Sequence, residues 1–192
     1  KDRFEMTPKE WKNGGYKEYS QKILLQSQRA SQSKANFKDM VPTIVKMPAI
    51  ESFYIRNKGY NVNIKETWQK LQTWILTNDI TSYKRIALFH DNPTITPLNE
   101  CQYIGCIMVE DKKSVKSDRL PNFKIADGVY AKFDLKGKTG DVLPFIHWVY
   151  HEWLPKSEYE TTTKPSYAIY EKLDILDESD EFELSFYVSI NF

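Results

Sequence analysis

The stretch HDNPTITP, residues 90–97, contains an adjacent histidine and aspartate, the pair that activates a nucleophile in many hydrolases. Such a dyad needs a serine or cysteine nucleophile, and the sequence has neither a G-x-S-x-G turn nor an activated-cysteine motif. The same stretch contains Asn92, Pro93 and Pro97, residues that form and stiffen turns. We therefore expect a connection between two strands, without catalytic residues.

The other histidines and the cysteines do not form a metal-binding pattern. His147 and His151 have the spacing of two ligands on one helical face, but no third ligand follows at a recognisable distance. Cys101 and Cys106, in CQYIGC, are an odd number of residues apart, so on a strand they point to opposite faces. We expect two reduced, half-buried thiols in a cytoplasmic protein that holds no metal and no cofactor.

Charge is distributed unevenly along the chain of 192 residues. Residues 1–36 contain eight Lys and Arg against four Asp and Glu, whereas the remainder contains 19 against 22. The first segment ends in the polar run LLQSQRASQSKANF, which is typical of a linker. The sequence thus predicts a first segment over 1–36 and one globular domain over 37–192. It contains no apolar stretch long enough to span a membrane, and its start without methionine indicates a fragment or a processed form.

The order of the predicted elements occurs twice. Strands are expected at 42–47 and 122–127, strands ending in Lys-Gly at 52–59 and 130–137, helices at 66–75 and 144–154, and closing strands at 85–91, 102–109, 166–172 and 183–190. Each half has too little apolar surface to fold alone. We predict an α+β fold in which the β-β-α-β-β repeats, about 43–110 and 120–192, form one antiparallel sheet. Both helices would pack on one face, with a ligand cleft at the seam between the repeats.

Two known families resemble different parts of the chain. FHDNPTITPLNECQYIGCIMV, with FYIRNKGY, WVYHEWLP, PSYAIY and SFYVSI, resembles the GyrI-like, or bacterial effector-binding, domain over residues 43–192. The start, KDRFEMTPKEWKNGG, resembles the end of an AraC-type DNA-binding region, with Phe4, Thr7, Pro8 and Trp11 at the matching positions. Together the resemblances imply an AraC-type transcription regulator. Residues 1–36 would be the remnant of its helix-turn-helix region plus a linker, and DNA binding would depend on a part upstream of Lys1.

The resemblance also implies a ligand-binding site. Relatives that bind apolar cations carry a buried glutamate in an x-E-I-Y context, where this chain has Ala168, so we expect a more neutral pocket. Glu152 matches a glutamate of the second helix, and Trp148 lies four residues before it, so the pair could hold a cation. The alternative is that Glu152 is a solvated helix residue. The remaining ligand-binding residues are strand aromatics expected to face the seam, for which core packing is the alternative: Tyr54, Phe89, Tyr170 and Tyr187.

Three functions are consistent with these observations. The first is an effector-binding domain that binds an apolar or aromatic ligand, neutral or cationic, and signals to an attached DNA-binding domain. The second is a stand-alone binder that sequesters a small molecule or toxin, or inhibits another protein. The third is a hydrolase of strained electrophiles, which Ala168 disfavours because it replaces one of the paired glutamates. The acidic run 174–183 is either a solvated loop or a docking surface for the DNA-binding part, and the oligomeric state is open because the edge strands can pair.

Overall fold

The computed structural model describes residues 4–60, 63–111, 115, 119–173 and 180–192. The chain begins with a helical segment made of α1 (Pro8–Glu10), the wide turn η1 (Trp11–Gly15), α2 (Tyr16–Leu24) and α3 (Gln28–Ser31). Thr7 and Ser27 cap α1 and α3, because each side-chain oxygen accepts a bond from a backbone N–H three residues later. No helix in the described ranges is long and apolar enough to cross a membrane.

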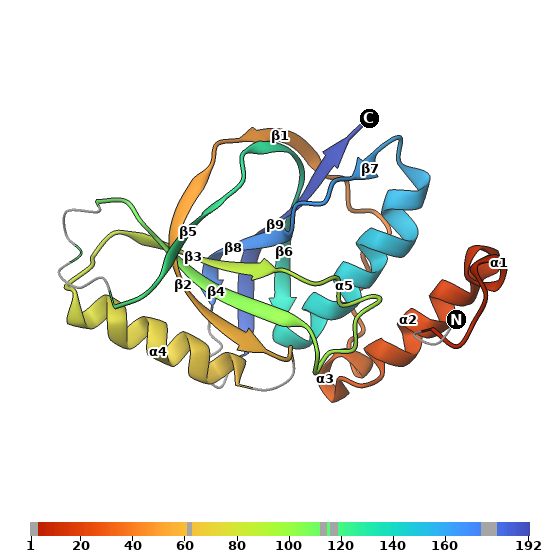
Figure 1. Cartoon of the computed structure of the whole chain (residues 1–192), viewed down its shortest axis with the longest axis horizontal. Coiled ribbons are helices and arrows are strands. Elements are labelled where there is room, and N and C mark those ends of the chain that lie inside the picture. Colours follow the sequence, from red (N-terminus) through yellow and green to blue (C-terminus); the bar gives the residue numbers. More distant parts are fainter. Residues whose placement is uncertain (1–3, 61–62, 112–114, 116–118, 174–179) are drawn as a thin grey trace.

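The strands that follow this segment form a strongly curled antiparallel sheet, shaped like half a barrel (Figure 1). Its strands are β1 (Thr43–Met47), β2 (Ile50–Lys58), β3 (Tyr83–Phe89), β4 (Gln102–Val109), β5 (Asn122–Ile125), β6 (Gly128–Lys138), β8 (Ser166–Leu173) and β9 (Glu181–Asn191). Their order across the sheet is β1-β6-β9-β8-β3-β4-β2-β5, and the short β7 (Glu160–Thr161) pairs with β9. The predicted α+β class and antiparallel sheet are therefore confirmed.

The two short opening strands do not pair with the strands that follow them. β1 pairs with β6, and β5 pairs with β2, so each joins the part of the sheet built by the other half of the chain. The halves meet where β3 pairs with β8, with Ala87 opposite Ala168. Chain segments far apart in sequence are thereby joined at the centre and at both edges of the sheet.

Two helical elements supply apolar side chains to one large core cluster on one face of the sheet. Helix α4 (Ile64–Thr77) buries Trp68, Leu71, Trp74 and Ile75, at the spacings of three and four that define one helical face. Gly105 of β4 permits the close approach, because a Cβ there would lie 2.9 Å from Cδ1 of Leu71.

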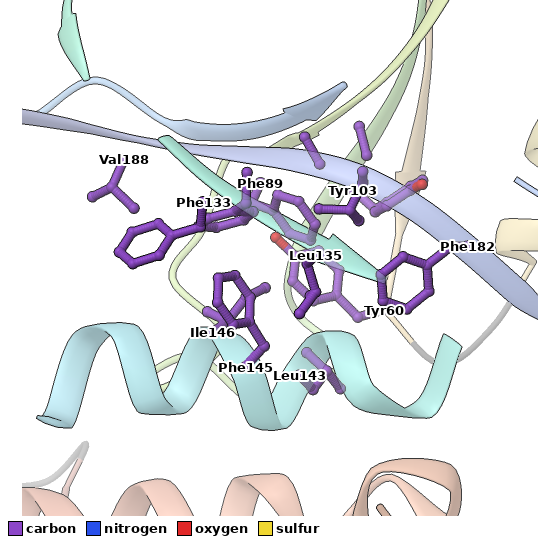
Figure 2. Packing of buried hydrophobic residues seen from close by; sticks show 14 of the residues in the cluster. Tyr60, Phe89, Tyr103, Phe133, Leu135, Leu143, Phe145, Ile146, Phe182 and Val188 are labelled. Atoms are coloured by element: carbon purple, nitrogen blue, oxygen red, sulfur yellow. The ribbon is translucent and has the colours of Figure 1, made fainter. Parts of the chain in front are cut away.

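The second helix lies across the other half of the sheet. Helix α5 (Val142–Trp148) continues into the wide turn η4 (Val149–Trp153) and the 3-10 turn η5 (Leu154–Lys156). It buries Phe145 and Ile146, and the Phe145 ring lies edge-on against Phe133 and Phe186 of the sheet, with centroids 5.6 and 5.4 Å away. Figure 2 shows Phe145 and Ile146 projecting from the helix toward Phe133 of the sheet.

The face of the sheet away from these helices has its own core. Its buried members are Ile50, Ile86, Leu88, Ile104, Cys106, Ile125, Tyr130, Tyr167, Ile169 and Tyr187. The cysteines are both free and lie on opposite faces of the sheet, as expected: Cys101 belongs to the first cluster and Cys106 to the second. Two details of the prediction were wrong: both thiols are fully buried, and Cys101 precedes β4 instead of lying in it.

Candidate functional site

A cleft of about 710 Å³ opens between the N-terminal ends of α4 and α5, above the middle of the sheet. The sheet supplies aromatic rings to it, and α5 supplies Leu143. The apolar residues lining it are Ala30, Tyr60, Ile64, Phe89, Tyr103, Val142, Leu143, Tyr170, Leu173 and Phe182. Figure 2 shows Tyr60, Phe89 and Tyr103 gathered on one side and Leu143 projecting toward them from the helix.

Three of these rings form an edge-to-face triangle at the floor of the cleft. The ring centroids of Tyr60, Phe89 and Tyr103 are 5.6, 5.9 and 6.1 Å apart, with interplanar angles of 84–85°. Tyr60 follows the end of β2, where Gly59 has φ of 100° and the Tyr60 N–H donates to the carbonyl of Leu98 at 2.8 Å. Phe89 and Tyr103 are opposite each other in the pairing of β3 with β4, so backbone register holds the triangle in place.

The polar groups of this floor are uncharged. Burial raises the pKa of the hydroxyls of Tyr60, Tyr103 and Tyr170, so all three stay protonated at neutral pH. The Tyr103 hydroxyl accepts a bond from Nε1 of Trp68 at 2.9 Å, and the Tyr60 hydroxyl donates to the carbonyl of Asp91 at 3.0 Å. The floor therefore presents aromatic rings to a ligand, together with neutral hydroxyl groups that already make hydrogen bonds within the protein.

Charged side chains lie at the mouth of the cleft. Arg29 donates from one nitrogen to both carboxylate oxygens of Asp180, at 3.1 and 3.2 Å. Among the lining residues in the described part of the chain, Asp180 is the one carboxylate, and Lys65 is a second cation. Within the described lining, the one carboxylate that could balance a cationic ligand is therefore already bound by a guanidinium.

The N-terminal segment forms one wall of this cleft. Residues 26–30, which include most of α3, line it. The carbonyl of Arg29 packs against Gly140, where a Cβ would lie 2.8 Å away, and the Ser33 hydroxyl donates to Asp141 at 2.6 Å. α3 is consequently seated on the turn that leads into α5.

The N-terminal segment also contacts the C-terminal end of helix α5 and the wide turn η4 that follows it. The hydroxyl of Ser20, on α2, lies 2.9 Å from Nδ1 of His147 and 2.7 Å from Nε2 of His151. Burial lowers the pKa of His147 to about 4, and burial followed by the charge of Lys17 lowers that of His151. Both imidazoles are therefore neutral at pH 7 and share one hydroxyl. The described part of the chain contains no group of three metal-binding side chains.

The structure brings together only some of the residues predicted from sequence. Phe89 and Tyr170 line the cleft, and Ala168 is fully buried in the same core cluster. Trp148 is partly buried against the rings of Phe37 and Phe133, and does not line the cleft.

The other predicted residues point elsewhere. Glu152 keeps 43% of its side chain exposed and pairs with Lys156 at 2.8 Å and Lys17 at 3.4 Å. The bond from Lys156 holds the pKa of this carboxyl below its usual value. Tyr54 and Tyr187 belong to the core on the opposite face of the sheet.

The sequence did not indicate helix α3 or several side chains that line the cleft: the aromatic residues Tyr60, Tyr103 and Phe182 and the aliphatic residues Ile64, Val142, Leu143 and Leu173. A signal existed for Tyr103, since any hairpin of the predicted strands 85–91 and 102–109 places it near Phe89. A signal also existed for α3, because Ser27 precedes a short helix-compatible run, QRAS. The polar composition of the surrounding residues indicated a linker instead.

The stretch HDNPTITP is a connection, as predicted, and joins β3 to β4. His90 is exposed, and the Asp91 carboxylate accepts a bond from the backbone N–H of Gln102 at 2.7 Å. The Asn92 side chain accepts from the N–H of Thr94 at 3.0 Å, which closes the turn. Asp91 thus holds the loop against the start of β4.

With this architecture, the chain belongs to the family of GyrI-like small molecule binding domains, whose model matches residues 40–190. A DNA gyrase inhibitor from Citrobacter koseri is 22% identical over 129 residues, covering 66% of this chain and 82% of that protein. EcmrR in a complex with DNA has a TM-score of 0.63 at 14% identity, covering 95% of this chain and 69% of that one. A hydrolase from Listeria innocua has a TM-score of 0.54 at 10% identity, covering 81% of this chain and 95% of that one.

Proposed function

We propose that the cleft between α4 and α5 is the ligand site of a cytoplasmic effector-binding domain, and that its ligand is an uncharged aromatic molecule. The observation that carries this proposal is the floor of rings whose polar groups are neutral, beside a carboxylate already bound by Arg29. Among the described lining residues, a cation bound there would lose water without gaining a free negative partner. A neutral aromatic ligand gains from ring contacts and apolar burial without that cost.

The cleft would lie at the seam of two β-β-α-β-β repeats, about 43–110 and 120–192. The sheet order supports this proposal, because it reads as two equivalent sets of four strands on either side of the β3–β8 pair. In this arrangement each repeat lends its first strand to the other, as β1 does to β6 and β5 to β2. Both walls of the cleft would thereby belong to a single domain made of the two repeats.

We propose that α3 carries the signal from the cleft to the N-terminal segment. Residues 26–30 touch the space that a ligand would occupy, and α2, which precedes them, is fixed to α5 through Ser20. In a full-length AraC-type regulator, residues 1–36 would connect this contact to the DNA-binding part. Phe37 would begin the domain itself, since it is buried with its ring centroid 5.4 Å from that of Phe145.

Two other functions are less well supported. A stand-alone binder would need the cleft but not the wall that α3 adds to it; the similarity to a DNA gyrase inhibitor is the observation in its favour. A hydrolase would need a carboxylate free to activate water, and Asp180, paired with Arg29, is the one carboxylate among the described lining residues. The partner we expect is a small-molecule effector, and contact with DNA would come through the DNA-binding part of a full-length regulator.

The proposal can be tested by titrating tryptophan fluorescence with two ligands of similar shape, neutral triphenylphosphine oxide and cationic tetraphenylphosphonium. Trp68 is a suitable reporter, because its ring centroid lies 6.0 Å from that of Tyr170 in the cleft. We expect the neutral ligand to bind about tenfold more tightly, a difference of about 1.4 kcal/mol. Tyr170→Leu should weaken it severalfold, and Tyr54→Leu, the same change on the opposite face, should not. Tighter binding of the cation, or equal effects of the two variants, would contradict the proposal.

A further inference from the structure

A second hollow, of about 320 Å³, lies on the face of the sheet away from α4 and α5. Its apolar part is formed by Leu88, Ile104 and Ile125. The rings of Tyr54 and Phe123 stand edge to face beside it, with centroids 5.0 Å apart. None of these five residues lines the cleft between the helices, so the two spaces are separated by the sheet.

The rim of this hollow carries positive charge. Arg56, Lys124 and Lys164 all line it and are exposed. Lys124 lies 3.5 Å from Glu51, and Lys164 donates to the neutral carbonyl of Asp127 at 2.6 Å. The Arg56 guanidinium makes no hydrogen bond or ion pair within the part of the chain that the structure describes.

The charged side chains described at this rim are all positive. Of the residues known to line the hollow within the described ranges, none is aspartate or glutamate. The site therefore combines an apolar floor, which favours rings and alkyl groups, with cations whose natural partner is an anion. A planar guanidinium matches a carboxylate in particular, because it can donate two parallel hydrogen bonds to the two oxygens.

We propose that this hollow is a second binding site, for a small aromatic or alkyl carboxylate. Arg56 holds the carboxylate at the rim, and the rings of Tyr54 and Phe123 pack against the apolar part of the ligand. The three cationic side chains are exposed to water in the free protein. A carboxylate bound to them is therefore not forced into a dry interior, and the ligand can enter and leave the site directly from solvent. This proposal does not depend on the function of the cleft.

The test is isothermal titration calorimetry with 2-naphthoate as the probe and its neutral amide, 2-naphthamide, as the reference ligand. We expect Arg56→Gln to weaken 2-naphthoate at least fivefold and to leave 2-naphthamide unchanged. Lys46→Gln is the matched control, because it removes one exposed positive charge from β1, outside the hollow. Ala126→Trp, which adds bulk at an exposed lining position, should weaken both ligands.

Backbone amide NMR shifts during the same titration locate the site. We predict that the largest changes fall in residues 122–126, which are β5 and the residue that follows it. Equal weakening by Arg56→Gln and Lys46→Gln would reduce the effect to unspecific charge attraction and overturn the proposal. Shift changes confined to residues 139–143 at the helical cleft, or no saturable binding of 2-naphthoate, would overturn it as well.

Discussion

Ala87 of β3 lies directly opposite Ala168 of β8 at the centre of the sheet, and both residues are fully buried. On the same face, two residues further along each strand, Phe89 and Tyr170 line the cleft. The two alanines thus lie in the buried core between these two rings, and Ala168 is at the position where the resemblance implies a glutamate in relatives that bind cations. Their identity is the simplest reason to expect a neutral ligand.

Ala168→Glu should convert the site toward cation binding at a cost in stability. A carboxylate placed in this apolar surrounding is buried without a partner, so we expect the free energy of unfolding to fall by roughly 3 kcal/mol. Tetraphenylphosphonium should then raise the melting temperature of the variant and leave that of the wild type almost unchanged. Ala168→Gln is the control, since it has the same shape without the charge. If the cation stabilised both variants equally, charge would not be what the site lacks.

Two buried tyrosines on opposite faces should respond differently to the same substitution. Tyr103→Phe removes the acceptor of the bond from Trp68, which leaves a buried N–H unpaired, so the free energy of unfolding should fall by about 1–3 kcal/mol. The hydroxyl of Tyr167 is buried and has no hydrogen-bond partner in the described part of the chain, so Tyr167→Phe should be neutral or stabilising. Urea denaturation of both variants checks this, and a greater loss in Tyr167→Phe would show that its hydroxyl has a partner.

The contact of α2 with α5 should weaken in acid. The pKa of His147 is lowered to about 4 by burial, below the ordinary value of 6.5, so the folded state favours the neutral ring. The stabilisation is therefore complete above pH 6.5 and is lost as the pH falls toward 4. His151 shifts in the same direction and adds to the effect.

The loss should amount to roughly 2 kcal/mol between pH 7.5 and pH 4.5, beyond that caused by the carboxylates. His147→Gln should remove most of this dependence of the unfolding free energy on pH, and His90→Gln, at an exposed position, should not. An unchanged pH profile in His147→Gln would mean that the imidazole does not titrate in this range.

The elements of the fold were predictable because their apolar residues follow the helical or strand period. The helix expected at 66–75 is part of α4, Ile64–Thr77, and the strand expected at 102–109 coincides with β4. The pairing of β1 with β6 and of β5 with β2 was not predictable. Those strands are short, and the sheet that accepts them is built by residues about 80 positions away.

The direction of the strand aromatics depends on register, which sequence period alone does not fix. Tyr187 pairs with Tyr167, the neighbour of Ala168, so it must face away from the side to which Ala168 points. Tyr54 is opposite Cys106 and faces the same way. Phe89 and Tyr170 point to the opposite face of the sheet from Tyr54 and Tyr187, and they line the cleft.

The position of Glu152 has a different cause. The helix expected over 144–154 changes at Val149 into a wide turn, which shifts the angular position of each following side chain relative to an α-helix. Lys17 on the docked helix α2 then pairs with Glu152 from outside. Because α2 lies in the segment that composition assigned to a tail and linker, this partner was absent from the sequence argument.

The central claim is that a neutral ligand in the cleft contacts α3 and fixes the N-terminal segment. Hydrogen exchange of the backbone amides in residues 26–33, with and without saturating triphenylphosphine oxide, tests it most directly. We predict that exchange there slows severalfold, and that Arg29→Gln, which opens the contact with Asp180, speeds it in the free protein. Exchange in residues 102–109 serves as the internal reference. If the ligand binds and the exchange of residues 26–33 does not change, α3 is not the element that reports occupancy of the cleft.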